Sequence, residues 1–282
     1  EMTVYNKDYF EWREEGILLE GVKDYYNKRL IIENMDGEIS SLFKYIKTLE
    51  KEQYVEKIII KASQDYLFPL LNKGYILEAY VPKFYKGDDR FFICRYKTQD
   101  RYHSPHFIKE DEIVTIVQNK EKVPVTSELK GYKLEKATIH DVEALATLYK
   151  QVFTVYPVPI FDPKYIENQM ENNTVFYYVK DETEKIIAAA SAEINIVGKS
   201  AEITDCATLP NSRKGGYMKH IITSLENELK KQNITCIYSI ARALSFGMNA
   251  VLHQLDYTYT GRLKNNCFIF DKIEDMNMWV KI

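Results

Sequence analysis

The chain has 282 residues, of which 45% are apolar, so it can bury one or two hydrophobic cores. The formal net charge of −3 and the lack of a long basic block argue against a dedicated nucleic-acid-binding protein. No run of about 18 apolar residues occurs, so no membrane-spanning helix is expected. Residues 1–12 lack the apolar segment of a signal peptide. We expect a cytoplasmic protein whose widely spaced cysteines are reduced thiols: Cys94, Cys206, Cys236 and Cys267.

The first third of the chain predicts a small α/β unit. Residues 1–27 carry scattered aromatic side chains without a clear period, and no element is assigned to them. Beyond them, apolar periods and turn residues predict the order β-α-β-α-β-β. The strands are expected at residues 29–34, 55–62, 75–81 and 90–96, and the helices at 40–51 and 64–72.

Residues 97–130 are charged and contain Pro105 and Pro124, which is typical of a linker, with a short helix expected near residues 110–118. His103 and His106 lie close together, but a proline separates them and no third ligand is nearby. We therefore expect no metal site.

The second half predicts the order β-α-α-β-β-β-α-β-α-β-β. Strands are expected at residues 132–136, 174–180, 185–195, 199–208, 234–241, 257–263 and 267–280. Helices are expected at residues 138–153, 162–171 and 245–254, with a further helix after residue 216 that has Met218, Ile221, Ile222, Leu225 and Leu229 on one face. The expected fold class is α/β with a mixed sheet.

A strand, a basic glycine-bearing turn and a helix follow one another within residues 200–232. The turn consists of Arg213, Lys214, Gly215 and Gly216. Such a turn offers backbone N–H groups and a helix N-terminus to an anionic phosphate. Neither G-x-x-x-x-G-K-[ST] nor G-x-G-x-x-G occurs, which excludes a Walker loop and the dinucleotide fingerprint. The alternative is a basic turn on a solvated surface.

The loop and the order of elements together resemble the GCN5-related N-acetyltransferases (GNAT superfamily). Their pyrophosphate loop has the form Q/R-x-x-G-x-G/A, and here Arg213, Gly216 and Met218 stand at its first, fourth and last places. This resemblance implies an acetyltransferase domain over residues 131–282, after a linker at 98–130. Residues 1–97 form a smaller domain, in which residues 28–97 are interpreted as a degenerate half-copy without the loop. The alternative there is a chance likeness between short α/β units.

Four further runs resemble the beta-lysine N-acetyltransferases: TDCATLP, ARALSFGMN, YTYTGRLKNNCFI and EDMNMWVK. That family usually has R-G-K-G-L-M where this chain has RKGGYM, and Gly-Tyr where it has Asp256-Tyr257. The resemblance implies direct acetyl transfer from acetyl-coenzyme A to the side-chain amine of beta-lysine, which yields a compatible solute. The alternatives are another amine, such as a polyamine or a protein lysine, and an inactive coenzyme-binding module. The expected partners are a small-molecule amine and, at most, a second copy of the chain as a homodimer.

Acetyl transfer to an amine requires a base that removes a proton from the ammonium group. Glu202 and Asp205 are the acids of the strand before the loop, and their spacing of three places them on opposite faces of a regular strand. The run AEI-x-x-CA resembles that of the histone acetyltransferases, in which the Glu is the base, so Glu202 is the expected base and Asp205 the alternative.

Many relatives use a Tyr on the last helix to protonate the leaving thiolate, and Leu252 stands at that position. Tyr257, Tyr259, Ser245 or solvent could supply the proton instead. Cys206 has no nearby His in the sequence and is interpreted as a packing residue rather than a nucleophile.

The same resemblance implies a set of binding residues. The coenzyme is expected at the backbone of Cys206, Ala207 and Thr208, at loop residues Arg213, Lys214, Gly215, Gly216, Tyr217 and Met218, and at Asn249. The substrate carboxylate is expected at Arg242 and Arg262, and its amines at Asn265, Asn266, Glu274, Asp275 and Asn277, with Tyr156 as a lid residue. The alternatives are turn caps for several of these, a polar helix surface for Asn249 and a core position for Tyr156.

Overall fold

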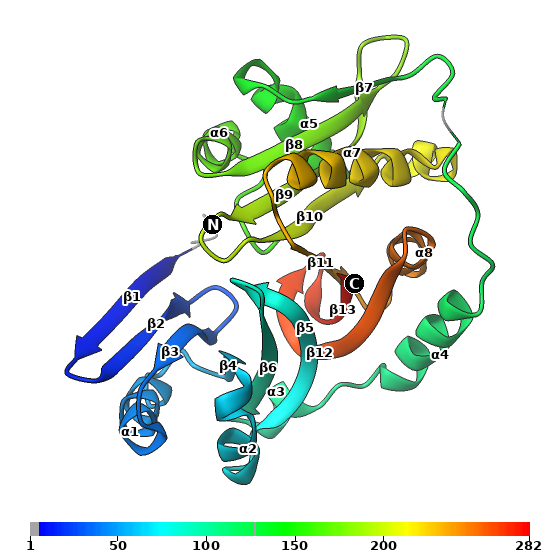
Figure 1. Ribbon diagram of the computed structural model, residues 1–282. Helices are drawn as coiled ribbons and strands as arrows, with labels where there is room; N and C mark the ends of the chain where they lie inside the picture. Colours follow the sequence, from blue (N-terminus) through cyan, green and yellow to red (C-terminus); the bar gives the residue numbers. More distant parts are fainter. Residues whose placement is uncertain (1–5, 127) are drawn as a thin grey trace.

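The computed structural model describes residues 6–126 and 128–282, and within them 13 strands form one continuous mixed sheet (Figure 1). The strand order is β1-β2-β3-β4-β6-β5-β12-β13-β11-β10-β9-β8-β7. The first half contains β1 (Lys7–Glu14), β2 (Ile17–Asp24), β3 (Arg29–Asp36), β4 (Lys57–Ala62), β5 (Ile76–Tyr85), β6 (Asp88–Tyr96), α1 (Ile39–Glu50) and α2 (Gln64–Asn72). The second half contains β7 (Lys133–Lys136), β8 (Thr174–Lys180), β9 (Ile186–Asn195), β10 (Ser200–Thr208), β11 (Cys236–Arg242), β12 (Tyr257–Ile269), β13 (Lys272–Lys281), α5 (Val142–Val152), α6 (Pro163–Glu171), α7 (Tyr217–Lys231) and α8 (Phe246–Gln254).

The two halves share one order of elements and one pattern of strand pairing. The series β1-β2-β3-α1-β4-α2-β5-β6 corresponds to β8-β9-β10-α7-β11-α8-β12-β13. In each series one strand pair is parallel, β3 with β4 and β10 with β11, and the last three strands are ordered β4-β6-β5 and β11-β13-β12. The halves join where Ala79 of β5 pairs with Gly261 of β12. A Cβ at Gly261 would lie 1.9 Å from the Glu78 carbonyl oxygen, so only glycine permits this junction.

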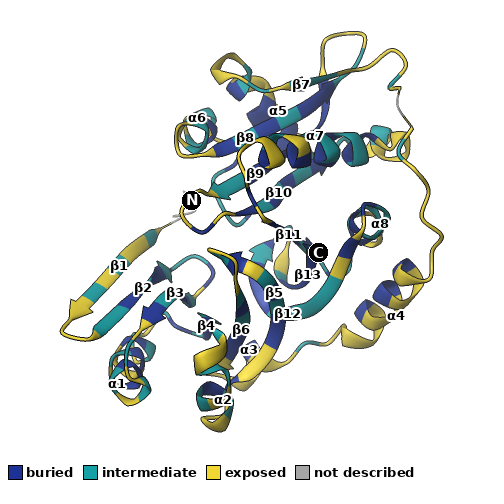
Figure 2. Ribbon diagram, viewed as in Figure 1, coloured by how far each residue is buried: buried dark blue, intermediate teal, exposed yellow. Residues whose placement is uncertain are grey.

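The β1–β2 hairpin corrects the expectation that residues 1–27 hold no regular element. Residues 1–5 lie outside the described part, but residues 7–14 pair with 17–24 in an antiparallel register. Most side chains of β1 are exposed because it is the outermost strand of the sheet, so its sequence lacks the apolar alternation of a half-buried strand (Figure 2). The shared order of elements therefore begins at β1, before residue 28.

Two further segments differ from expectation in ways that bear on the site. The turn before the last strand falls at residues 270–271, and the polar run Lys264, Asn265 and Asn266 is an irregularity inside β12, where the register to β13 shifts and Asn265 has φ of 41°. The expected linker contains α3 (Gln99–Tyr102) and α4 (Phe107–Gln118). Ile113 and Val117 of α4 join the hydrophobic core beneath α7 and α8, so this segment packs on the second half.

Four clusters of buried side chains hold the layers together. Helices α1 and α2 pack on one side of the first half of the sheet, α7 and α8 on one face of the second half, and α5 and α6 on its other face. The fourth cluster joins the two halves and includes Ile59 and Phe92 from the first half with Tyr238, Leu263 and Met278 from the second. The side of β11, β12 and β13 that α5 and α6 leave uncovered therefore meets the helix-free face of the first half of the sheet.

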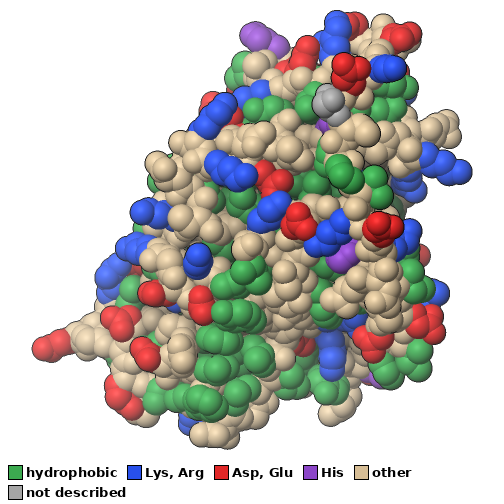
Figure 3. Space-filling model, turned by 45° about the vertical axis from the view of Figure 1, so that its right-hand side comes forward, with side chains coloured by type: hydrophobic (Ala, Val, Ile, Leu, Met, Phe, Trp, Pro, Cys, Tyr) green, Lys and Arg blue, Asp and Glu red, His purple; other side chains and the backbone are tan. Residues whose placement is uncertain are grey.

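The surface of the described chain gives two further facts. No helix of residues 6–126 and 128–282 is long and apolar enough to cross a membrane. On the face in Figure 3, Lys and Arg side chains lie among Asp and Glu rather than in one continuous block.

Candidate functional site

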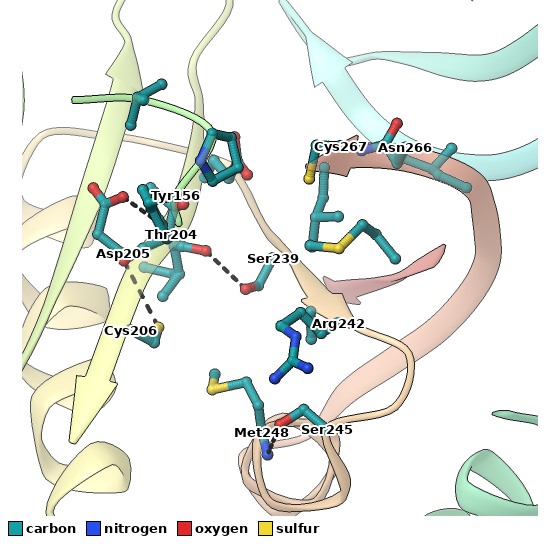
Figure 4. Close-up of a pocket in the computed structure, with 18 of the residues that line it drawn as sticks. Tyr156, Thr204, Asp205, Cys206, Ser239, Arg242, Ser245, Met248, Asn266 and Cys267 are labelled. Atoms are coloured by element: carbon teal, nitrogen blue, oxygen red, sulfur yellow. Dashed lines mark hydrogen bonds between the residues drawn. The ribbon is translucent and has the colours of Figure 1, made fainter. Parts of the chain in front are cut away.

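A cavity of about 560 Å³ lies where the two halves of the sheet meet. Residues of β10, β11, β12, α8 and the segment after α5 line it, together with residues of β1, β3, β4 and β6 from the first half. In Figure 4, Tyr156, Asp205 and Cys206 lie on one side, Asn266 and Cys267 on the other, and Arg242, Ser245 and Met248 near α8. The cavity therefore collects side chains that are more than 200 residues apart in the sequence, such as Lys7 and Asn266.

A β-bulge in β10 places both of its acids in this cavity. The register between β9 and β10 shifts between Thr204 and Ala207, and Asp205 takes the unusual φ of 52°. A bulge reverses the alternation of side chains, so Glu202 and Asp205 line the same cavity. The expectation that they lie on opposite faces is wrong, because it assumed a regular strand.

Glu202 faces a second carboxylate that the sequence analysis missed. Glu193 of β9 pairs directly with Glu202 in the antiparallel register, and both line the cavity. Burial raises the pKa of Glu202 to about 7. The ammonium group of Lys61 opposes this rise, and the Asp205 carboxylate adds to it. Burial, with the neighbouring Glu202, raises the pKa of Glu193 to about 8. A two-residue turn at Val197 and Gly198, between the strands expected at residues 185–195 and 199–208, would have sufficed to place Glu193 opposite Glu202.

Asp205 is held by hydroxyl groups. Its carboxylate accepts hydrogen bonds from Tyr156 at 2.7 Å and from Ser191 at 2.6 Å, and its backbone oxygen accepts one from Tyr149 at 2.8 Å. Burial raises the pKa of Asp205, while the two donors to its carboxylate oppose the rise. Tyr156 thus lines the cavity and fixes this acid, and it is also buried in the core with Phe153, which is the alternative position considered for it.

We expect Tyr156→Phe to lower the free energy of unfolding by about 1–3 kcal/mol, because it removes a donor from a buried carboxylate. Tyr149→Phe is the matched control, since it removes an equally buried hydroxyl that bonds only the Asp205 backbone. The pKa of Asp205 should rise further in Tyr156→Phe, so its stability loss should be full above that pKa and shrink as protonation removes the charge. Denaturant titrations across pH measure this, and equal, pH-independent losses in both variants would contradict it.

The loop before α7 contributes Arg213 to the cavity, and the first turn of α7 contributes Met218. It forms a 3-10 helix, Pro210–Gly215, and then Gly216 with φ of 70° as the residue that precedes α7. A Cβ at Gly216 would meet nothing within 4 Å, and no side chain caps the N-terminus of α7. The first backbone N–H groups of this helix therefore have no capping side chain, as an anion site requires.

The other loop residues are not among those that line the cavity. Tyr217 is buried and packs against Tyr132, with ring centroids 4.8 Å apart. A Cβ at Gly215 would lie 2.2 Å from the Tyr217 ring, so this glycine is needed for packing. Lys214 is exposed on the same turn.

Strands β10 and β11 separate next to the loop. Their parallel pairing covers residues 200–203 with 236–239, and β10 then continues to Thr208 without β11 as its partner. Cys206 and Thr208 line the cavity beside this gap, whereas the Ala207 side chain packs under α5. Burial raises the pKa of the Cys206 thiol, which argues against a reactive thiolate and agrees with its interpretation as a packing residue.

Of the three side chains expected as proton donors to the thiolate, Tyr257, Tyr259 and Ser245, Ser245 lines the cavity. Its hydroxyl caps α8 by accepting the Met248 N–H at 3.4 Å. The Tyr257 hydroxyl instead donates to Glu226 at 3.2 Å inside the core beneath α7, and Tyr259 packs on Trp279. The structure thus separates Tyr257 from the cavity, because its strand face points toward α7.

Asn249 is enclosed and fully engaged within the protein. Its amide nitrogen donates to the carbonyls of Arg242 and Ser245, and its amide oxygen accepts from Asn277 and Trp279. It has no exposed surface, so the structure corrects the expectation that it contacts a coenzyme. Its bonds instead fix the turn between β11 and α8, from which Arg242 and Ser245 enter the cavity.

Among the substrate-binding candidates beyond Tyr156, Arg242 and Asn266 line the cavity. Arg242 is already paired with the buried Glu274 carboxylate, to which its second bond measures 3.0 Å. Arg262 points to α4, where it bonds Asp111 at 2.7 Å, and also donates to Asn277. The side-chain amide of Asn265 donates to the carbonyls of Arg101 and His103, and its backbone N–H donates to the Asp275 carboxylate. The side chains of four candidates thus hold α3, α4 and the bent β12 in position: Arg262, Asn265, Asp275 and Asn277. Glu274 instead holds Arg242, and none of these five residues is among those that line the cavity.

The first half of the chain supplies basic residues that sequence reasoning missed. Lys7 of β1, Arg29 of β3 and Lys61 of β4 all line the cavity. No local sequence signal indicates this, because it depends on the two half-sheets meeting face to face. The cavity thus combines three carboxylates, a set of cations and an open helix N-terminus beside a separated strand pair.

Comparison with known proteins agrees with this geometry. The sequence model of the Acetyltransferase (GNAT) family matches residues 142–253. N-acetyltransferase YodP of Bacillus subtilis (strain 168) is 39% identical over 92% of this chain and 94% of its own length. Beta-lysine N(6)-acetyltransferase of Methanococcus maripaludis is 31% identical over 91% of this chain and 93% of its own length. Beta-lysine N(6)-acetyltransferase of Methanosarcina mazei is 32% identical over 87% of this chain and 98% of its own length. The chain therefore belongs to the GNAT family of N-acetyltransferases, acyltransferases whose cosubstrate is acetyl-coenzyme A.

Proposed function

We propose that the protein acetylates the side-chain amine of a small diamino acid, with beta-lysine as the first candidate. The observation that carries this proposal is the mixed charge of the cavity, where Glu193, Glu202 and Asp205 share one space with Lys7 and Lys61. A diamino acid offers ammonium groups to the first set and a carboxylate to the second. Two relatives that match most of the chain bear beta-lysine in their names, which supports the choice.

In this proposal Glu202 removes the proton from the attacking ammonium group, directly or through a water molecule. A base is most effective when its pKa lies near the working pH, and burial brings the pKa of Glu202 to about 7. The Glu202 side chain is partly buried, so less solvent is present to stabilise the protonated amine of the acceptor. In the same proposal Ser245, at the N-terminus of α8, donates a hydrogen bond to the departing thiolate, whose charge the helix end also favours, and solvent supplies the proton that the thiolate takes up.

The chain has features that fit acetyl-coenzyme A. The uncapped N-terminus of α7 and the open space at Gly216 suit the pyrophosphate, with Arg213 as a nearby cation. The edge of β10 from Thr204 to Thr208 that has no β11 partner offers backbone groups to the pantetheine arm. Arg213, Met218 and the end of β10 line the same cavity as Glu202, so the thioester would reach Glu202 from the loop side.

We expect one acetyl-coenzyme A site per chain, although the element order occurs twice. In the first half, Gly37 and Glu38 alone connect β3 to α1. The Glu38 carboxylate accepts hydrogen bonds from the Ser40 hydroxyl and from the backbone N–H groups of Ser40 and Ser41, the latter two both at 3.0 Å. These hydrogen bonds, of which the one from the Ser40 hydroxyl has the largest effect, lower the pKa of Glu38 to about 2. The Glu38 carboxylate thus occupies the N-terminus of α1, whereas the corresponding N-terminus of α7 has no capping side chain. Titration calorimetry should give one site, and two independent sites would contradict this.

A thiol-release assay tests the acceptor. It compares beta-lysine, lysine, ornithine, spermidine and a lysine-containing peptide at equal concentration, and we expect the highest kcat/KM for beta-lysine. The three carboxylates of the cavity favour a polyamine as the second candidate, because several positive charges could face them. A higher kcat/KM for spermidine than for every diamino acid would overturn the proposal, and no turnover with any amine would support a coenzyme-binding module.

A further inference from the structure

We propose that the first half of the chain forms the carboxylate-binding side of the acceptor pocket, through Lys7 of β1 and Lys61 of β4. This inference rests on the proposed function and assigns a substrate-selecting role to the half that lacks the phosphate loop. It would make the enzyme selective for diamino acids over the diamines that lack a carboxylate.

The position of the first half supports this role. Its helices α1 and α2 cover one side of its strands, while Ile59 and Phe92 on the other side pack against Tyr238 and Leu263 of the second half. The same inner side continues into the cavity with Lys7, Arg29 and Lys61. These cations therefore face the carboxylates of β9 and β10 across one space, and the ammonium groups of Lys61 and Lys7 both oppose the rise in the pKa of Glu202 and of Glu193.

The other cations of the cavity are committed to internal partners or to the phosphate loop. Arg242 is paired with Glu274, whose side chain is 3% exposed, and Arg29 is paired at 2.6 Å with Asp24, whose side chain is fully buried. Arg213 belongs to the loop before α7. Lys61 shares its charge with Glu33 at 2.7 Å, but that carboxylate is 38% exposed and can turn to solvent. Lys7 has no ion-pair partner among the described residues.

The arrangement separates the two ends of the acceptor by charge. An amine to be acetylated belongs near Glu202, and a carboxylate on the same molecule would be attracted to Lys7 and Lys61. A diamine would present either an apolar end or a second ammonium group to the same lysines, which is unfavourable. The pocket thus selects by attraction for one class and by repulsion against the other.

The test compares an amino acid with the diamine that it leaves on decarboxylation, since the two differ only by the carboxylate. We would measure kcat/KM for beta-lysine and its decarboxylated diamine, and for lysine and cadaverine, in the intact protein and in Lys7→Met and Lys61→Met. We expect each variant to lower the ratio of amino acid to diamine by at least tenfold, mainly through KM of the amino acid. Using the ratio cancels any change in the pKa of Glu202, because that change affects both acceptors equally.

Lys23→Met is the matched control. Lys23 is also a half-buried lysine of the first half that is paired with a glutamate, Glu52 at 2.6 Å, but it lies outside the cavity lining. In Lys23→Met the ratio of kcat/KM for the amino acid to that for the diamine should stay unchanged. All three variants should keep the parental affinity for acetyl-coenzyme A. An unchanged ratio in both Lys7→Met and Lys61→Met, or a parental enzyme that prefers the diamines, would overturn the inference. If lysine rather than beta-lysine is the better acceptor and its ratio falls in the variants, the choice of beta-lysine fails while the inference is supported.

Discussion

Glu202→Gln should lower kcat/KM by at least about 10²-fold, which corresponds to about 2.7 kcal/mol of lost transition-state stabilisation. The amide keeps the size and polarity of the side chain but cannot accept a proton. In the parental enzyme the base must be ionised, so kcat/KM should rise as the pH passes upward through about 7, the raised pKa of Glu202. The variant should lose that rise, and its deficit should shrink at high pH, where free amine forms without help.

Two variants in the same cavity serve as controls for this experiment. Glu193→Gln makes the same chemical change at the residue paired with Glu202. The pKa of Glu193, about 8, is higher than that of Glu202, so Glu193 ionises after Glu202, and the ammonium group of a bound substrate favours that ionisation. Asp205→Asn alters a carboxylate that two hydroxyl groups already engage. Both should lose less than about tenfold in kcat/KM. A large, pH-dependent loss in either control with little loss in Glu202→Gln would assign the base to that residue instead.

Gly216→Val should weaken acetyl-coenzyme A binding at least tenfold, as measured by titration calorimetry. The added methyl groups would enter the open space before α7, where no protein atom lies within 4 Å of the new Cβ and where the pyrophosphate is expected. Valine is also strained at φ of 70°, by roughly 1–2 kcal/mol, so a loss of stability accompanies the change.

Gly74→Val separates the two effects. Gly74 has φ of 86°, and its Cβ would likewise meet nothing within 4 Å, but it lies between α2 and β5 in the first half. The two variants should lose similar stability in thermal unfolding, and only Gly216→Val should lose affinity. Unchanged affinity in a folded Gly216→Val protein would show that this loop does not hold the phosphates.

The sequence by itself determined most of the local elements and the basic, glycine-bearing turn before α7. The apolar period of Leu42, Phe43, Ile46 and Leu49 predicted α1, because those side chains share one face of a helix and are buried together. Pro163 after the capping Asp162 predicted the start of α6. Arg213 and Gly216 before an amphipathic helix predicted the loop beside the cavity, since the special backbone of Gly216 is a property of one residue.

Only the tertiary structure decided which side chains share the cavity. The β10 bulge moves Asp205 to the side of Glu202, and bulges arise from the fit between neighbouring strands rather than from one strand's composition. The exposed strand β1 showed no apolar period, yet its Lys7 reaches the site. Asn249 and Arg262 carry the residue types of a binding site, but partners distant in the sequence use their hydrogen-bonding groups. Local periodicity reports the neighbours along one element, whereas the site depends on how two half-sheets meet, which no single element encodes.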